Sequence, residues 1–187
     1  QLGTGHAVLQ AKDLLAGEHG TIMVLCGDTP LLTAELLARF HEEHVQAGAK
    51  ATVLTAIMPN AKGYGRIVRR ENGEVLKIVE HKEAAPEELE IHEVNAGIYC
   101  FDADALFSAL AKVTNNNAQG EYYLPDVLSI LRDAGEKIWA VVADNYECTL
   151  GINSRSQLAV AERILRKRKV EELMADGVTI IDPKTTF

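Results

Sequence analysis

The residues with the clearest chemical potential lie where an apolar run meets a carboxylate. Residues 21–26 predict a buried strand that stops at Gly27, and Asp28 follows at once. In an open α/β sheet, ligands bind just beyond the carboxyl ends of the strands, and a glycine lets a ligand approach the backbone closely. Asp28 therefore suits a divalent cation, a ribose or a metal-bound phosphate, although a turn aspartate before a new helix explains these residues equally well.

A second candidate is an amide near the start of the longest predicted helix. Asn153 follows Gly151-Ile152 and directly precedes Ser154, which with Gln157 three positions later has the pattern of a capping box. An amide oxygen is a suitable ligand for a hard cation such as Mg²⁺. Asn153 is thus a candidate metal or substrate ligand, and the alternative is a loop amide that supports the helix.

The N-terminal segment places two glycines and a hydroxyl ahead of a predicted helix. Gly3, Thr4 and Gly5 precede His6, and backbone N–H groups at such a start can contact a base, a ribose or a phosphate. An ordinary turn explains Gly3 and Thr4 as well. His6 fits a packing role better than a chemical one.

Three further polar or flexible positions flank predicted strands. Gly65 lies in the segment 63–66, which either lets a sugar approach the backbone or forms a turn with an exposed arginine. Glu80 ends the apolar run 75–79, where a carboxylate can bind sugar hydroxyls or serve as an ordinary edge charge. Asn95 opens the next strand and has the same two interpretations.

The order of elements predicts an α/β fold. Helical spacing and strand-like runs alternate, and Asn72-Gly73 indicates a hairpin in the middle of the chain. A strand–helix–strand unit implies a right-handed parallel crossover. We therefore expect a Rossmann-like α/β domain with a mixed, mostly parallel sheet and a small antiparallel insertion. The expected helices are 5–16, 34–47, 104–112, 121–134 and 154–175, and the expected strands are 21–26, 51–57, 65–70, 75–79, 96–101, 138–143 and 178–181.

Composition excludes several classes of protein. The 187 residues carry a formal net charge of −8, which argues against a protein that coats nucleic acid. The basic run 166–169 is better explained as a solvated helix face. No long uncharged apolar segment is present, so we expect no membrane partner. The three cysteines, Cys26, Cys100 and Cys148, lack metal-ligand spacing and are expected to be buried free thiols of a cytoplasmic protein.

Taken in order, these motifs resemble the uridyltransferase half of the GlmU family. Members of that family are bacterial bifunctional enzymes, both N-acetylglucosamine-1-phosphate uridyltransferase and glucosamine-1-phosphate acetyltransferase. The resemblance covers essentially the whole chain, and the block 114–126 is its most specific part. The shared segments are Gln-Leu-Gly-Thr-Gly-His-Ala, Gly-Asp-x-Pro-Leu, Gly-Tyr-Gly-Arg-Ile-Val, Ile-Val-Glu-His-Lys, Asn-Ala-Gly-Ile, Thr-Asn-Asn-Asn-Ala-Gln-Gly-Glu-Tyr-Tyr-Leu-Pro-Asp and Gly-Ile-Asn-Ser-Arg.

The resemblance implies a reaction and its partners. UTP and N-acetylglucosamine 1-phosphate would give UDP-N-acetylglucosamine, a precursor of peptidoglycan and lipopolysaccharide, together with pyrophosphate. It also implies Mg²⁺ as cofactor and a cytoplasmic enzyme. Such a transfer needs positioning and charge stabilisation more than covalent chemistry, and the sugar phosphate is already ionised, so no general base is required.

The resemblance also implies the role of each candidate residue. The positions of Gly3 and Thr4 contact the uracil end, and Gly27 belongs to the substrate-binding set. Asp28 and Asn153 hold the magnesium ion. The residues that line the sugar and its acetamido group are Gly65, Glu80, Asn95 and Asn153.

Some features of the family are missing from these 187 residues. The first strand and a glycine-rich loop, which grips the triphosphate with an arginine and a lysine, would precede Gln1. We therefore expect residues 1–177 to be a partial uridyltransferase domain with little turnover by itself. Residues 178–187 would start a linker toward a left-handed β-helix, which carries the acetyltransferase and builds homotrimers. The family often has an aromatic residue at the position of Cys26.

The residues are also compatible with two other functions. The chain could transfer a nucleotide to another sugar 1-phosphate, because the segment Gly27-Asp28 is shared by sugar nucleotidyltransferases generally. It could also be a non-catalytic module that binds a nucleotide sugar, because the glycine-rich loop is not in the sequence.

Overall fold

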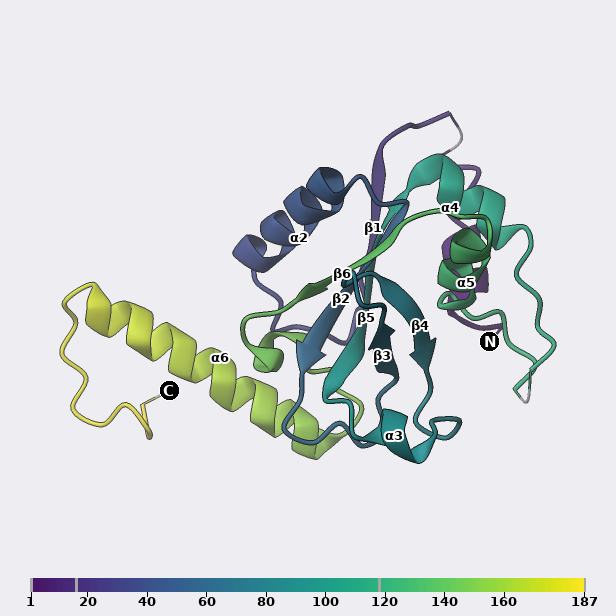
Figure 1. The fold of residues 1–187 in the computed structure, drawn as a ribbon. Coiled ribbons are helices and arrows are strands. Elements are labelled where there is room, and N and C mark those ends of the chain that lie inside the picture. The colour runs from purple at the N-terminus through teal and green to yellow at the C-terminus, as the bar shows by residue number, and fades with distance from the viewer. Residues whose placement is uncertain (1, 16, 118, 187) are drawn as a thin grey trace.

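The protein is an α/β domain built on one six-stranded sheet. The computed structural model describes residues 2–15, 17–117 and 119–186. In Figure 1, helix α2 lies on one side of the sheet and helices α4 and α5 lie on the other. The elements are α1 (Thr4–Leu9), β1 (Thr21–Val24), α2 (Ala34–Ala47), β2 (Ala51–Ile57), β3 (Arg66–Arg69), β4 (Val75–Val79), α3 (Pro86–Leu89), β5 (Glu93–Asp102), α4 (Ala103–Leu110), α5 (Asp126–Asp133), β6 (Ile138–Val142), the 3₁₀ helix η1 (Tyr146–Thr149) and α6 (Arg155–Ala175).

Strand β5 is the centre of the sheet. The strand order is β4-β3-β5-β2-β6, and β1 pairs with the same edge of β5 as β3. Strand β2 occupies the other edge, and only the β2–β6 pair is parallel among the described strands. The expected mixed α/β sheet is confirmed, but the expectation that it is mostly parallel is wrong.

The reason for this difference is the position of β5. Strands β1 and β2 each run antiparallel to β5 from opposite sides, so they run parallel to each other without being neighbours. The crossover through α2 therefore passes over a strand that comes later in the chain. Local periodicity predicts the elements but not which strands lie next to one another.

Helix α2 covers one face of the sheet. Its N-cap Thr33 accepts a hydrogen bond from the Leu36 N–H at 3.2 Å, and its C-cap Gly48 has a left-handed φ of 58°. Leu36 and Phe40 are buried on the sheet side. His44 is also buried, and its Nδ1 lies 2.8 Å from the Thr52 hydroxyl on β2.

Helices α4 and α5 bury the opposite face. The Asp102 carboxylate caps α4 by accepting from the Ala105 N–H at 2.9 Å, and it also binds Lys50 Nζ at 2.9 Å. Phe101, Leu106 and Val127 are fully buried in this larger core. The two apolar layers pack on either side of β5, which carries Asn95 and pairs with β1, β2 and β3.

Four predicted elements differ in the structure. The strand predicted to be buried over 21–26 ends at Val24 and is half-buried, and Leu25 after it is 45% exposed. Helix α1 ends at Leu9, and turns replace the later part of the predicted helix 5–16, of which residue 16 lies outside the described part. Helix α5 begins only at Asp126, because Tyr122 instead exchanges backbone hydrogen bonds with the N-terminal segment. Residues 178–181 form no strand, and Ile181 is 98% exposed.

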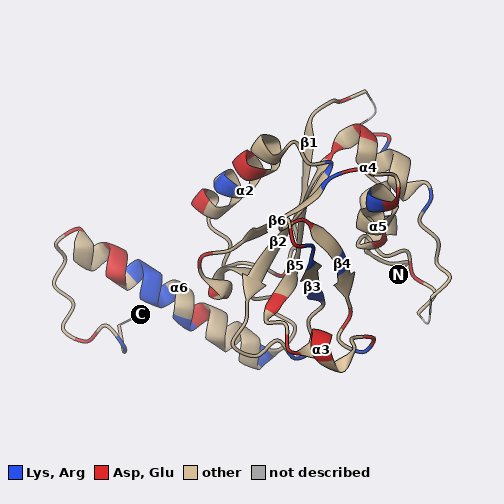
Figure 2. Ribbon diagram, viewed as in Figure 1, with Lys and Arg blue, Asp and Glu red and all other residues tan. Residues whose placement is uncertain are grey.

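Helix α6 projects away from the body of the domain (Figure 1). Ser154 Oγ accepts from the Gln157 N–H at 3.2 Å, as predicted, but Gln157 Oε1 accepts from the Asn153 N–H at 2.7 Å rather than from Ser154. Figure 2 shows basic and acidic residues interspersed along the helix. The prediction that residues 166–169 form a solvated face holds for Lys167 and Lys169, which are exposed, but not for Arg168, which is half-buried. Arg168 fastens α6 to the body by donating to the Leu31 carbonyl at 2.8 Å.

No helix in the described part of the chain has the length and apolar character that crossing a membrane requires.

Candidate functional site

Asp28 and Asn153 lie together although they are far apart in the sequence. The Ile152 N–H donates to the Asp28 carbonyl oxygen at 2.9 Å, which fastens the loop after η1 to the loop after β1. A Cβ added to Gly151 would lie 3.3 Å from Asp28 Oδ2 and 3.8 Å from Asn153 Nδ2. The two side chains therefore approach one point, and the missing side chain of Gly151 leaves room between them.

The donor chemistry of this pair fits Mg²⁺. Asp28 and Asn153 are both exposed, so water can complete the coordination, and Mg²⁺ usually keeps several waters while binding one or two protein oxygens. No cluster of three or more His, Cys, Asp or Glu side chains suited to a metal exists among the described residues. The Asn153 amide would need to turn so that its oxygen, rather than its nitrogen, faces the ion.

Gly65, Glu80 and Asn95 form a second group. The Asn95 N–H donates to the Gly65 carbonyl oxygen at 2.9 Å, and a Cβ on Gly65 would lie 3.2 Å from Glu80 Oε1. Gly65 immediately precedes β3, Glu80 immediately follows β4, and Asn95 is in β5. The β3–β4 hairpin and the pairing of β3 with β5 thus bring together three of the four predicted sugar-binding residues, whereas the fourth, Asn153, lies beside Asp28.

A β-bulge sets the direction of the Asn95 side chain. The register of β2 and β5 shifts so that Leu54 pairs with Ile98 while Thr55 pairs with Asn95. Gly97, in the extra segment, has a φ of 74°, and its N–H donates to Asn95 Oδ1 at 2.9 Å. Bulges are frequent beside binding sites because they redirect a side chain. The spacing Asn-x-Gly is the sequence signal that could have indicated this turn.

Cys26 connects the two groups. Its thiol donates to the Gly97 carbonyl oxygen at 3.2 Å, which links the loop of Asp28 to the bulge that carries Asn95. Partial desolvation, and secondly the Asp28 carboxylate, raise the pKa of this thiol. The prediction that all three cysteines are buried is wrong for Cys26, which is exposed, whereas Cys100 is buried and Cys148 is half-buried.

Gly3 and Thr4 pack against the chain segment that precedes α5. The Thr4 hydroxyl accepts from the Leu124 N–H at 3.0 Å, and the Gly5 N–H donates to the Tyr122 carbonyl oxygen at 2.8 Å. Gly3 has a φ of 98°, and a Cβ there would lie 2.5 Å from the same carbonyl. Both residues therefore have structural roles in holding the N-terminal segment against the segment that precedes α5.

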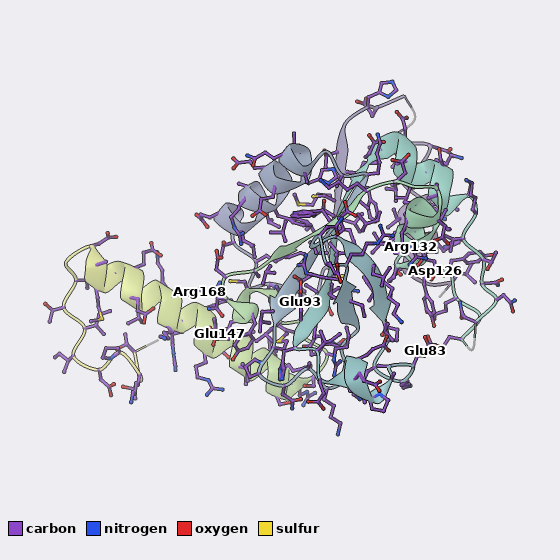
Figure 3. The ribbon with its side chains drawn as sticks, viewed as in Figure 1. Glu83, Glu93, Asp126, Arg132, Glu147 and Arg168 are labelled. Carbon is purple, nitrogen blue, oxygen red and sulfur yellow. The ribbon has the colours of Figure 1, made fainter. Side chains whose placement is uncertain are left out.

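A large hollow lies between β4, α5 and the loop before α5. Its volume is about 740 Å³, and its described lining includes Thr4 and Glu80 but neither Asp28 nor Asn153. Burial first, and then the Glu83 carboxylate, raise the pKa of Asp126 in its wall. Figure 3 shows charged side chains from the surrounding elements on this side of the domain. The mixed polar lining, which suits a polar ligand, includes Lys77, Lys82, Glu83, Asn116, Tyr123 and Arg132.

Arg66 is another residue whose environment the sequence did not reveal. The expected turn is present, since the Tyr64 N–H donates to the Ala61 carbonyl oxygen at 3.2 Å, but the expectation of an exposed arginine is wrong, because Arg66 is only 3% exposed. Its guanidinium donates to the Tyr64 carbonyl oxygen. This contact holds the chain immediately before Gly65, so Arg66 supports the backbone on which the second group depends.

The fold and the site define the chain as a nucleotidyl transferase. The nucleotidyl transferase family model matches residues 1–149, and the chain belongs to that family. Its curated relatives include proteins named bifunctional protein GlmU. The chain is 58% identical to the protein of Shouchella clausii, 57% to that of Halalkalibacterium halodurans and 56% to that of Bacillus cytotoxicus. Each alignment covers the whole of this chain and 41% of the relative.

Proposed function

We infer that this chain takes part in the transfer of UMP from UTP to N-acetylglucosamine 1-phosphate, with release of pyrophosphate. The observation that carries the inference is the joining of the two groups of residues. Asp28 and Asn153 meet beside Gly151, and Asn95 meets Gly65 and Glu80. Cys26 ties one group to the other through Gly97. A ligand with a phosphate at one end and a hydroxyl-rich ring at the other matches this arrangement.

The chemistry divides between the two groups. A phosphate oxygen of the sugar phosphate forms a bond to the α-phosphorus of UTP while the bond from that phosphorus to the pyrophosphate oxygen breaks. Asp28 and Asn153 would hold Mg²⁺, which when bound neutralises charge on the phosphate oxygens. Glu80 can accept hydrogen bonds from sugar hydroxyls, and Gly65 and Gly27 permit the close approach of the ligand. The role of these residues is to orient the reacting groups.

The relatives support this assignment over its alternatives. Proteins named bifunctional protein GlmU match this chain along its entire length. The N–H donor of the Asn95 amide and the acceptor carboxylate of Glu80 suit an acetamido substituent next to a hydroxyl. A nucleotidyltransferase for another sugar 1-phosphate would share the Asp28 group but need not share the Asn95 group. A non-catalytic nucleotide-sugar-binding module would keep both.

Calorimetric titration of the 187-residue chain with UDP-N-acetylglucosamine, with and without MgCl₂, tests the proposal. We expect binding that strengthens with Mg²⁺ and is at least about fivefold tighter than binding of UDP-glucose, since one hydrogen bond to the acetamido group is at stake. Equal affinities for UDP-N-acetylglucosamine and UDP-glucose would support a nucleotidyltransferase that acts on another sugar 1-phosphate. Pyrophosphate release from UTP, with a panel of sugar 1-phosphates, is the second measurement. Little release is expected from the 187-residue chain itself, so it is selective binding without any release by the complete gene product that would support the non-catalytic module.

A further inference from the structure

The hydroxyl of Tyr99 is a buried polar group that the proposed function does not use. Tyr99 is only 2% exposed, and its ring stacks on Phe101 with the centroids 5.6 Å apart. A buried tyrosine hydroxyl normally has a hydrogen-bond partner. Here the partner is Asn95, which lies four residues earlier on the same strand and across the bulge.

Tyr99 contacts both polar atoms of the Asn95 amide. The distance from Asn95 Nδ2 to the Tyr99 hydroxyl oxygen is 2.8 Å, and the distance from that oxygen to Asn95 Oδ1 is 3.2 Å. The shorter contact has the amide as donor and the hydroxyl as acceptor. Burial raises the pKa of Tyr99, so the hydroxyl stays protonated at any physiological pH.

A third contact determines which end of the amide is the oxygen. The Gly97 N–H lies 2.9 Å from Asn95 Oδ1, and a backbone N–H can be met only by an acceptor. The amide nitrogen must therefore face Tyr99. With the orientation fixed at both ends, Nδ2 retains one N–H that Tyr99 does not take.

We propose that Tyr99 is a positioning residue that, with the Gly97 N–H, locks the Asn95 amide so that it offers a ligand one N–H donor. Asn95 then recognises a hydrogen-bond acceptor, and the carbonyl oxygen of an N-acetyl group is such an acceptor. Glu80, beside it, can only accept while ionised. The pair therefore selects a ligand that presents an acceptor and a donor together, as an acetamido group next to a hydroxyl does.

The inference deepens the proposed function and rests on it, because it takes Asn95 as the residue that contacts the sugar. The preference for the acetylated ligand would then depend on the free energy needed to rotate the Asn95 amide. Without the Tyr99 hydroxyl, the Asn95 amide would sample other orientations, and a ligand would have to restore the productive one. The loss is expected only for ligands that have the acetamido group.

The central test compares affinities for UDP-N-acetylglucosamine and UDP-glucose in the 187-residue chain. Tyr99→Phe keeps the stacked ring and removes only the hydroxyl. We expect it to lower the preference for the acetylated ligand by about three- to tenfold, the usual effect of one hydrogen bond, with little change for UDP-glucose. An unchanged preference in Tyr99→Phe would overturn the proposal. A wild-type chain without any preference would instead contradict the proposed function.

Two variants of Asn95 complete the test. Asn95→Asp can still accept from Gly97 and Tyr99 but has no N–H to donate, so we expect it to lose the preference. Tyr99→Phe should have no further effect on the preference in an Asn95→Ala background, because Tyr99 acts through Asn95. Additive losses in the double variant would mean that Tyr99 acts in some other way. Tyr146→Phe, which removes a hydroxyl outside this cluster, serves as the matched control.

A measurement without ligand addresses the positioning directly. The side-chain NH₂ signals of Asn95 in a ¹H–¹⁵N spectrum are identified as the pair that Asn95→Asp removes. In Tyr99→Phe we expect this pair to shift and to exchange faster with water, while the backbone spectrum stays dispersed. If the Asn95 NH₂ signals do not move in a folded Tyr99→Phe variant, the locking role of Tyr99 is wrong, whatever the ligand data show.

Discussion

The backbone N–H of Ile152 donates a hydrogen bond to the carbonyl oxygen of Asp28 at 2.9 Å. This bond joins the loop that follows β1 to the loop that precedes α6. As a consequence, the side chain of Asn153 reaches the same point as the carboxylate of Asp28, beside Gly151. The pairing of these two residues is a property of the tertiary fold.

Removal of the Asp28 carboxylate should abolish the effect of Mg²⁺ on ligand binding. Asp28→Ala leaves the backbone bond to Ile152 in place, so we expect the chain to stay folded. The gain in affinity for UDP-N-acetylglucosamine on adding MgCl₂ should disappear, and any pyrophosphate release should fall at least about a hundredfold. Asp13→Ala, at an exposed position on a distant turn, is the control. A gain that survives in Asp28→Ala would rule out Asp28 as a metal ligand.

Gly27 and Gly65 permit a second prediction that separates ligand approach from packing. A Cβ on Gly27 would meet nothing within 4 Å, whereas a Cβ on Gly65 would lie 3.1 Å from the Ile78 side chain and 3.2 Å from Glu80. Gly27→Ala should therefore keep the thermal stability of the chain but weaken binding, because its methyl group takes space that the ligand needs. Gly65→Ala should weaken binding and lower the melting temperature as well.

Thermal unfolding and calorimetric titration of the two alanine variants measure these effects. Full affinity in Gly27→Ala would show that the ligand does not approach this part of the backbone, and the substrate-binding role of Gly27 would then be wrong.

The sequence was a good guide wherever one segment determines the local structure. The bounds of the helix 34–47 and the start of α6 at Ser154 were predicted from residue types, and the structure confirms them. Each of these features depends on contacts within about four residues. The class of fold also followed, because alternating helical and strand-like periods require layers of helices on a sheet.

The sequence was a poor guide to features that depend on distant partners. The neighbours of β5 could not be predicted, since strand order depends on which apolar faces pack together. The segment before α5 has a helical pattern, yet Tyr122 N–H binds the Leu2 carbonyl oxygen at 2.8 Å instead. The contacts of Cys26 with Gly97 and of Tyr99 with Asn95 could not be predicted either, because only the bulge brings these residues together.

The close packing of Gly3 against Tyr122 gives a third prediction. Gly3→Ala would place a Cβ 2.5 Å from the Tyr122 carbonyl oxygen, at a φ of 98° that alanine rarely adopts. Relief of the clash requires movement of the backbone before α5. We expect a loss of about 2–4 kcal/mol in the free energy of unfolding, of which the unfavourable φ contributes about 1–3 kcal/mol.

Gly20→Ala is the matched control for this variant, because Gly20 has a φ of 124° and nothing within 4 Å of its Cβ position. It should show only the loss that comes from the backbone angle. Urea unfolding of the two variants measures the difference, and equal losses would mean that contact with Tyr122 is unimportant.

The buried histidine on α2 gives the final prediction, which concerns pH. Burial against the sheet, followed by the positive charge of His41, lowers the pKa of His44, and the Asp102 carboxylate opposes this shift only in part. The folded protein therefore binds fewer protons at His44 than the unfolded chain, in which the pKa is about 6.5. The contribution of neutral His44 to the free energy of unfolding is therefore fully present above pH 6.5. It is lost as the pH falls from 6.5 toward the lower pKa of the folded state.

Substitution of His44 should flatten this pH dependence. In His44→Gln, an amide can still bond to the Thr52 hydroxyl but does not titrate, so the free energy of unfolding should change less between pH 7 and pH 5 than in the wild type. His19→Gln, whose histidine side chain is 78% exposed, is the matched histidine control. Urea unfolding at half-unit pH intervals gives the slopes. If the free energy of unfolding of His44→Gln depends on pH as strongly as that of the wild type, groups other than His44 cause the acid sensitivity, because residue 44 no longer takes up a proton.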